Sequence, residues 1–402
     1  MNDQENEKNS RGLPLDIIIM IALRCNPIDA YRYLSITIPL KLMYIWKKHP
    51  GVFVYDGSCS IPEGVEYVVV SSKLHEVKRE TFKNNNDIRW VYIEDGITSI
   101  QKDAFCDCKR LERVRIPDSI TIIKDCAFIR CTSLKSLILP DSVTTIGEYA
   151  FYECCSLTTV TIPDSVTTIG EYAFYECISL TTVNIGNSVT TIDKYAFSYC
   201  FRLTTVNIGN SVTTIGMHAF AGCCSLKSVN IPDSVTVIGM YAFVGCFSLT
   251  AVIIPDSVTK IGVHAFGGCC SLTAVIIPDS VTTIGMHTFA GCCSLKSVNI
   301  GNSVIVIDMG AFSECCSLKS VNIPDSVVTI GKCAFEECTS LTTVNIGNSV
   351  TVINNFAFSN CSSLTTVTIP DSVVTIEKNI FSDCSKELIL QWKGDIHVID
   401  NV

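Results

Sequence analysis

A unit of 23 residues repeats along most of this 402-residue chain without a single insertion. The phenylalanine of the unit marks each copy, beginning at Phe82 and Phe105 and ending at Phe381. A fixed period between about 20 and 50 residues is typical of solenoid proteins, in which each rung packs only on its neighbours. The repeat therefore predicts one elongated stack of rungs, rather than the two or three globular domains that this length otherwise suggests.

The copy at residues 156–177 shows what one rung is expected to contain. The pattern L-x-x-V-x-I predicts a short strand with one buried face, Pro-Asp-Ser predicts a turn, and V-x-x-I predicts a second short strand. The segment Glu171–Cys177 is expected to form about one helical turn that inserts Ala173 and Phe174 into the core. The predicted fold class is thus an α/β solenoid, a superhelix of short parallel strands with one helical turn per rung.

The turn between the two strands occurs in two versions. One version is Pro-Asp, as at Pro140-Asp141, and the other is Gly-Asn, as at Gly186-Asn187. Glycine and asparagine both tolerate a positive φ. We therefore expect the Gly-Asn rungs to use a different type of turn.

Thirteen of the 23 cysteines occupy one position of the repeat, three residues after the phenylalanine. They are Cys108, Cys131, Cys154, Cys177, Cys200, Cys223, Cys246, Cys269, Cys292, Cys315, Cys338, Cys361 and Cys384. Stacked strands lie at a spacing that disulfides tolerate, so bridges between rungs are one interpretation. Zinc binding is a second, although the grouped C-x₂₋₄-C pairs that zinc sites use are not repeated within reach of one another. A buried ladder of reduced thiols is the interpretation we favour.

Composition and charge exclude several classes of function. The net charge of −9 is unsuited to nucleic acid, which selects clustered Lys and Arg. The polar N-terminus lacks the pattern of a signal peptide, and the apolar run Ile17–Leu23 is too short to span a membrane. We expect a cytoplasmic protein with no membrane span.

The repeat unit resembles the BspA-like subfamily of leucine-rich repeats. It is clearest in Leu157–Cys177 and Leu226–Cys246, and the resemblance covers Leu74–Cys384. The resemblance implies a curved solenoid whose L-x-x-V-x-I strands line the concave face. Members of this subfamily are often cell-surface attachment proteins. This chain departs from them because its N-terminus shows no export signal.

The N-terminal block at 13–46 resembles an F-box in its opening pattern. Leu13-Pro14 is followed by an apolar stretch and, after a polar break, by a second one. The positions that carry the resemblance are Leu13, Pro14, Ile17, Ile21 and Leu34. It implies a small helical head that binds a Skp-type adaptor of a cullin ubiquitin ligase, while the repeats select the substrate. The alternative is a helical cap that covers the first rung.

No cluster of residues in the sequence has the spacing of a catalytic or cofactor site. Three histidines share one repeat position, at His218, His264 and His287, but tyrosines occupy the same position in other rungs. A row of amphipathic side chains explains this better than a metal site does. We therefore predict no enzyme activity, no metal and no cofactor.

The outward positions of the L-x-x-V-x-I strands are the predicted site for a protein partner. Most of these positions carry Thr, Ser or Asn. The predicted partner-binding residues are Arg113, Arg115, Ala251, Ile253, Ala274, Ile276, Asn299 and Asn322. Exposed apolar residues on a polar background are typical of contact sites. Drift among duplicated repeats is the alternative.

These observations predict five segments. They are a disordered tail at 1–12, the F-box-like or capping segment at 13–50, a divergent cap at 51–73, the repeats at 74–386 and a C-terminal cap at 387–402. The predicted function is that of an intracellular protein-interaction scaffold, specifically an F-box-type substrate adaptor. The alternative is a surface or secreted adhesin.

Overall fold

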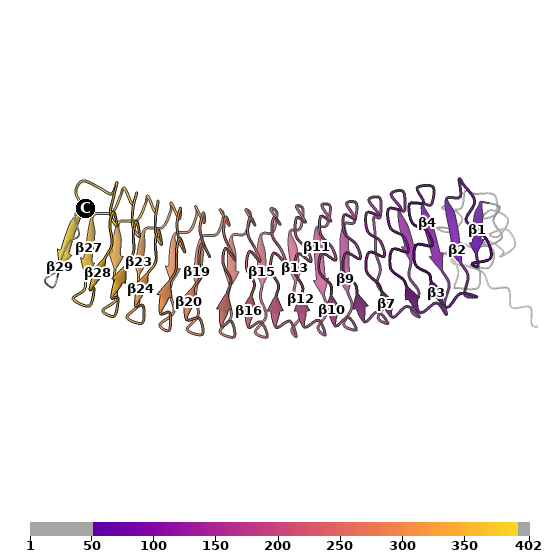
Figure 1. The fold of residues 1–402 in the computed structure, drawn as a ribbon, viewed down its shortest axis with the longest axis horizontal. Helices are drawn as coiled ribbons and strands as arrows, with labels where there is room; N and C mark the ends of the chain where they lie inside the picture. The colour runs from indigo at the N-terminus through magenta and orange to yellow at the C-terminus, as the bar shows by residue number, and fades with distance from the viewer. Residues whose placement is uncertain (1–50, 393–402) are drawn as a thin grey trace, which may run out of the picture.

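The computed structural model describes residues 51–392, which form an elongated, gently curved solenoid of stacked rungs (Figure 1). The chain advances steadily along the rod, so the two ends of the described chain lie at opposite ends of the molecule. Most rungs contribute one strand of three or four residues and one strand of two residues.

The longer strands are β1 (Val52–Tyr55), β2 (Tyr67–Val70), β4 (Trp90–Ile93), β6 (Arg113–Arg115), β9 (Thr159–Ile162), β11 (Thr182–Ile185), β13 (Thr205–Asn207), β15 (Ser228–Asn230), β17 (Ala251–Ile253), β19 (Ala274–Ile276), β21 (Ser297–Asn299), β23 (Ser320–Asn322), β25 (Thr343–Asn345), β27 (Thr366–Ile369) and β29 (Ile389–Trp392). The two-residue strands are β3 (Glu76–Val77), β5 (Ser99–Ile100), β7 (Ile122–Ile123), β8 (Thr145–Ile146), β10 (Thr168–Ile169), β12 (Thr191–Ile192), β14 (Thr214–Ile215), β16 (Val237–Ile238), β18 (Lys260–Ile261), β20 (Thr283–Ile284), β22 (Val306–Ile307), β24 (Thr329–Ile330), β26 (Val352–Ile353) and β28 (Thr375–Ile376).

Strands of neighbouring rungs pair in parallel with the 23-residue offset that the repeat predicts. Val183 of β11 pairs with Val206 of β13 on one side and with Val160 of β9 on the other. The last strand, β29, keeps this register, since Leu390 pairs with Val367. The parallel solenoid is therefore confirmed.

The core is a set of side-chain ladders that run along the rod. The repeat phenylalanines are buried, and consecutive rings from Phe82 to Phe381 stack with centroids 4.7–5.8 Å apart. The inward Val and Ile of β9 are buried while its threonines are exposed, as the alternating pattern predicts. Each added rung thus extends one continuous core.

The expected helical turn at Glu171–Cys177 is wrong, because this segment folds into successive tight turns. Tyr172 and Glu176 have φ values of 57° and 54°, which an α-helix cannot contain. The amide of Phe174 donates to the carbonyl oxygen of Ala196 in the next rung, at 2.8 Å. The amides alternate between a bond to the next rung and a turn bond within the rung, such as Tyr175 N to Tyr172 O at 3.2 Å. Residues 51–392 contain no helix, and the predicted helical segment at 13–50 lies outside the described residues.

The expectation of a second turn type in the Gly-Asn rungs is also wrong. The amide of Val189 donates to Gly186 O at 3.3 Å, as the amide of Val166 donates to Pro163 O at 3.1 Å in the Pro-Asp rung before it. Neither Gly186 nor Asn187 has a positive φ. Glycine is required here by close packing, since a Cβ at Gly186 would lie 2.4 Å from Pro163 O.

The repeated cysteines form the predicted ladder of reduced thiols, and every described cysteine is free. The Sγ of Cys177 donates to the carbonyl oxygen of Phe151 in the preceding rung, at 3.3 Å, and the other ladder thiols make the equivalent contact. Burial raises the pKa of the ladder thiols from Cys108 to Cys338, to about 12 for Cys108. These thiols therefore stay protonated, and each satisfies a buried carbonyl group.

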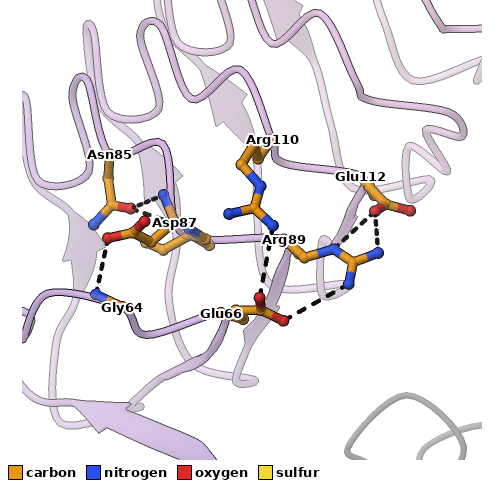
Figure 2. Close-up of polar contacts among 8 residues, drawn as sticks. Gly64, Glu66, Asn85, Asp87, Arg89, Arg110 and Glu112 are labelled. Carbon is orange, nitrogen blue, oxygen red and sulfur yellow. Dashed lines mark hydrogen bonds and ion pairs between the residues drawn. The ribbon is translucent and has the colours of Figure 1, made fainter.

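A cluster of charged and polar side chains joins the first rungs (Figure 2). The Arg89 guanidinium lies between two carboxylates, donating to Glu112 from Nε at 2.9 Å and lying 3.7 Å from Glu66 Oε2. Arg110 also approaches Glu66, at 3.6 Å. Asn85 replaces the ladder cysteine, and its Oδ1 accepts hydrogen bonds from two backbone amides. The divergent end is thus held by specific charge pairs.

Candidate interaction surface

The longer strands present a face on which every second side chain points outward. We call it the long-strand face. It consists of the outward-pointing residues of the strands that are three or four residues long. From β9 to β15 its outward positions are Thr, Ser and Asn. Asn207 Nδ2 donates to Asn184 Oδ1 at 2.6 Å, so these amides form a neutral ladder of their own. The expectation that this face is the concave one stays a prediction.

The predicted apolar residues lie together in the middle of this face. Ala251 and Ile253 are on β17, and Ala274 and Ile276 are on β19 in the next rung. Ile253 is 72% exposed and Ile276 is 64% exposed. We call these four residues the isoleucine patch. Two aliphatic side chains that meet water this fully, on adjacent rungs of a polar face, are the strongest sign of a contact surface in the described chain.

Asn299 on β21 and Asn322 on β23 are also exposed and follow the isoleucine patch on the same face. They continue the polar rows that flank the patch on its other side. The four apolar residues of the patch are thus bordered by polar side chains on both sides.

The predicted arginines lie near the other end of the face, each over an aromatic ring. The guanidinium carbon of Arg113 is 5.2 Å from the centroid of Trp90, and that of Arg115 is 4.8 Å from Tyr92. Arg115 is held further by Ile93 O, 2.8 Å from Nη1, and by Asp95 Oδ1, 3.0 Å from Nη2. Cation–π contacts of this kind fix the planes of both guanidinium groups.

A pocket of about 310 Å³ opens beside these stacked pairs. It is lined by Trp90, Tyr92, Arg113, Arg115 and Ile138, among other residues. Ile138 is 80% exposed at the pocket's edge. Sequence reasoning found the arginines but missed the pocket. The available signal was the pair of aromatic residues at the outward positions of β4, where the regular rungs carry Thr, Ser or Asn.

The histidine row is a stack of rings, as the shared tyrosine position suggests. Rings from Tyr149 to His287 stack continuously, and His264 lies 4.6 Å from His287 with nearly parallel planes. Burial lowers the pKa of His218 and His264. Within residues 51–392, no three His, Cys, Asp or Glu side chains are grouped to hold a metal ion.

The residues predicted to bind an adaptor, Leu13, Pro14, Ile17, Ile21 and Leu34, lie outside the described residues. Between residues 51 and 392 no helix has the length and hydropathy needed to cross a membrane.

The repeats of this chain match a known family of repeats. The family described as "BspA type leucine rich repeat region (6 copies)" matches residues 59–177, 144–271 and 259–388. The chain belongs to this family. The predicted BspA-like resemblance is thereby confirmed, and the match extends over nearly all of the described solenoid.

Solved structures of bacterial leucine-rich repeat proteins are similar to this chain. A leucine-rich repeat protein from Bacteroides ovatus has 26% identity and a TM-score of 0.64, over 85% of this chain and 92% of that one. One from Eubacterium ventriosum has 23% identity and a TM-score of 0.48, over 83% and 91%. A leucine-rich cell surface protein from Faecalibacterium prausnitzii has 28% identity and a TM-score of 0.45, over 86% and 88%. The search of curated proteins found no match.

Proposed function

We propose that this BspA-type repeat protein is a non-catalytic scaffold that binds a protein partner on its long-strand face. The observation that carries the proposal is the exposure of Ile253 and Ile276 on adjacent rungs. An apolar centre with a polar rim is the arrangement that protein interfaces use, and most of the binding energy comes from the buried centre. The partner's contact surface is therefore apolar, with neutral polar groups around it.

The pocket beside Arg113 supplies a second contact point on the same face. Asp95 pairs with Arg115, whereas Arg113 forms no ion pair with any described residue. Trp, Tyr and Arg are the residues most enriched at the centres of protein interfaces. A partner that spans both points offers a carboxylate to Arg113 and an aliphatic surface to the isoleucine patch.

Affinity capture with matched variants tests the scaffold. Ile253→Lys with Ile276→Lys places two charges in the patch, and Asn345→Lys with Thr368→Lys places the same charges at equivalent polar positions of adjacent rungs outside the proposed contact region. We expect the wild-type chain and the Asn345/Thr368 variant to capture the same protein, and the isoleucine variant to lose at least about tenfold of it, because a buried unpaired charge is costly. Equal capture by all three chains removes the patch from the interface. If the wild-type chain captures no protein, the proposal that it is a binding scaffold is wrong.

The finer proposal, that residues 13–46 dock on a Skp-type adaptor, rests on the sequence pattern alone. Leu13→Ala with Pro14→Ala should abolish binding of a purified Skp-type protein and leave thermal unfolding of the repeats unchanged. The competing cap predicts the reverse result, in which no adaptor binds and the variant unfolds at a lower temperature.

The alternative role, a surface or secreted adhesin, rests on the common role of the subfamily. Fractionation of the source cells separates the two. Recovery of the protein in the cytoplasm supports the adaptor, and recovery at the surface or in the medium supports the adhesin.

A further inference from the structure

One rung interface near the middle of the solenoid lacks strand pairing on both of its sheets. It lies between the rungs at 249–271 and 272–294, and we call it the interrupted interface. β17 and β19 do not pair, and neither do β18 and β20, although the strands on either side continue their ladders. In the described chain no other interface between rungs loses its pairing in the short-strand sheet from β3 to β28.

The loosening is also visible in individual hydrogen bonds. Gly262 donates its amide to Ile238 O at 2.8 Å, whereas the equivalent bond from Gly285 to Ile261 O is absent from the described residues. A Cβ at Gly262 would lie 2.4 Å from the backbone of the preceding rung, but one at Gly285 would lie 3.5 Å from Ile261 O. The two rungs are therefore farther apart at this point than their neighbours are.

One substitution coincides with the missing bond at Gly285. Thr288 occupies the position that alanine holds in the rungs on both sides, at Ala265 and Ala311, and it is fully buried. Its Oγ1 donates to Gly285 O at 2.7 Å and would lie 3.4 Å from a Cβ at Gly285. The added hydroxyl group therefore contacts the residue whose amide lacks its bond to the preceding rung, and we infer that it shifts Gly285 away from that rung.

Two thiols face each other across this interface, on the edge of the rod. Cys270 is on the first rung and Cys293 on the second, each one residue after its ladder cysteine. Cys293 is exposed and Cys270 is partly exposed. Both thiols donate to a glycine carbonyl of their own rung, at 3.3 Å, so the two side chains point the same way. The 23-residue register places both at the same position of adjacent rungs, and the amide of Ser294 donates to Cys270 O at 3.1 Å across the interface.

This juxtaposition is not general along the edge. Cys155 and Cys224 occupy the same repeat position, but Ile178 and Phe247 follow them in the next rung. Cys316 continues the row beyond Cys293, at an interface where β22 and β24 are paired. The pair Cys270 and Cys293 is therefore the one that bridges the weak interface.

We propose that Cys270 and Cys293 are a modification site for thiol–disulfide exchange, whose product is a disulfide that links the two rungs of the interrupted interface. The co-reactant is a small disulfide such as oxidised glutathione. The Cys293 thiolate attacks one sulfur of that disulfide and releases one glutathione thiolate. The Cys270 thiolate then attacks Sγ of Cys293, forms the S–S bond and releases the second glutathione. The two cysteines lose two protons and two electrons, and two molecules of glutathione thiol are formed.

The geometry permits the bond, and the surroundings slow its formation. Across this interface the Phe266 and Phe289 rings stack with centroids 5.4 Å apart, a rung spacing within the Cα separation of about 4.4–6.8 Å that disulfides adopt. Burial and the neighbouring Cys270 thiol raise the pKa of Cys293. The thiolate is therefore scarce near neutral pH, and the exchange rate should rise as the pH rises. Once formed, the link replaces the missing strand pairing with a covalent bond.

Cleavage at methionine identifies the linked residues. The folded full-length chain is incubated with oxidised glutathione, its remaining thiols are alkylated, and it is cleaved after Met240, Met286 and Met309. A disulfide between Cys270 and Cys293 joins the fragments 241–286 and 287–309 in mass spectra taken without reductant. A link between 287–309 and the fragment that begins at residue 310 assigns the bond to Cys316 and overturns the proposal.

Three variants complete the test. Cys293→Ser should abolish the link, and the matched control Cys224→Ser should retain it. If the link persists in Cys293→Ser, it belongs to the ladder thiols and the proposal is wrong. In Cys316→Ser the link should form as in the wild type. Hydrogen exchange at Thr282 and Gly285 should slow on oxidation, and unchanged exchange in the linked chain would show that the bond does not close the interface.

Discussion

Two neighbouring rung interfaces carry almost the same sequence and are joined differently. Between the rungs at 226–248 and 249–271, strand β15 pairs with β17 and β16 pairs with β18. One rung later, at the interrupted interface, neither pairing forms. The phenylalanine and cysteine ladders nevertheless cross both, since Phe243–Phe266 and Phe266–Phe289 stack at 5.3 and 5.4 Å. Backbone hydrogen bonds between the turn segments also cross the interrupted interface, such as Phe266 N to Thr288 O at 2.9 Å. The comparison shows that the core ladders and these turn hydrogen bonds keep the rungs in register where strand pairing is lost.

The largest expected effect concerns the thiol ladder, which both interfaces share. The thiols are neutral when folded, and burial raises their pKa, so the folded chain retains protons that the unfolded chain loses above pH about 9. Stability is fully present below that pH and is lost as the pH rises toward the folded pKa values. The slope is about 1.4 kcal/mol per pH unit for each ladder cysteine whose pKa is raised, a set that leaves out Cys384.

Urea titrations between pH 8 and 11 measure this slope, at a fixed temperature and with a reductant present. Cys223→Ala should lower it by the contribution of one thiol. A free energy of unfolding that does not change over this range would contradict the buried thiol ladder.

The next effect concerns the phenylalanine stack. Phe220→Ala removes a fully buried ring from a rung whose strands pair with both neighbouring rungs. It should lower the free energy of unfolding by about 3–5 kcal/mol. Because coupling is between neighbours, we expect faster hydrogen exchange from Leu203 to Leu249 and little change beyond Leu272, where the interrupted interface ends the paired ladders. Exchange that is unchanged near residue 220 would refute the assigned register.

A smaller effect is expected when each interface receives the residue that the other one carries at this repeat position. Thr288→Ala should let the rungs close and stabilise the interrupted interface by about 1 kcal/mol, whereas Ala265→Thr should cost its neighbour about 1–3 kcal/mol. Thermal unfolding with residue-level hydrogen exchange measures both. If Thr288→Ala leaves exchange at Gly285 unchanged, Thr288 is not the cause of the spacing.

The smallest effect concerns the charged end of the solenoid. Arg89 is 31% exposed and contacts two carboxylates, so Arg89→Ala should cost about 1 kcal/mol. The exposed pair Lys194–Glu171 in the regular rungs should contribute less than this, because both side chains are more exposed. Single alanine variants compared at low and high salt test this difference. An equal loss at both sites would show that the divergent rungs gain nothing from their ion pairs.

Periodic features of the sequence predicted most of the fold. The 23-residue register, the buried ladders and the reduced state of the repeated cysteines follow from residue spacing, because each rung meets the same neighbours. The turn at Glu171–Cys177 did not follow, since a run such as Glu-Tyr-Ala-Phe suits a helix locally. Its left-handed residues are stabilised by hydrogen bonds to the next rung. Local propensity contains no information on such contacts.

The candidate surface was partly predictable for the same reason. Ile253 and Ile276 stand out because their row is otherwise polar, and the structure leaves both exposed. The pocket beside Trp90 was missed because it needs three rungs to form it, and no single rung shows a signal. Thr288 was missed because one small substitution among many looks like drift until the loss of pairing is seen.

Hydrogen exchange of the reduced native chain tests the central claim, that within residues 51–392 the solenoid loses strand pairing in both of its sheets at one defined interface, beside its exposed patch. The account predicts that Thr282 and Gly285 exchange at least about tenfold faster than Thr259 and Gly262, a ratio that corresponds to about 1.4 kcal/mol. Equal rates at the two pairs of amides would contradict it, because the two interfaces would then be equally closed in solution.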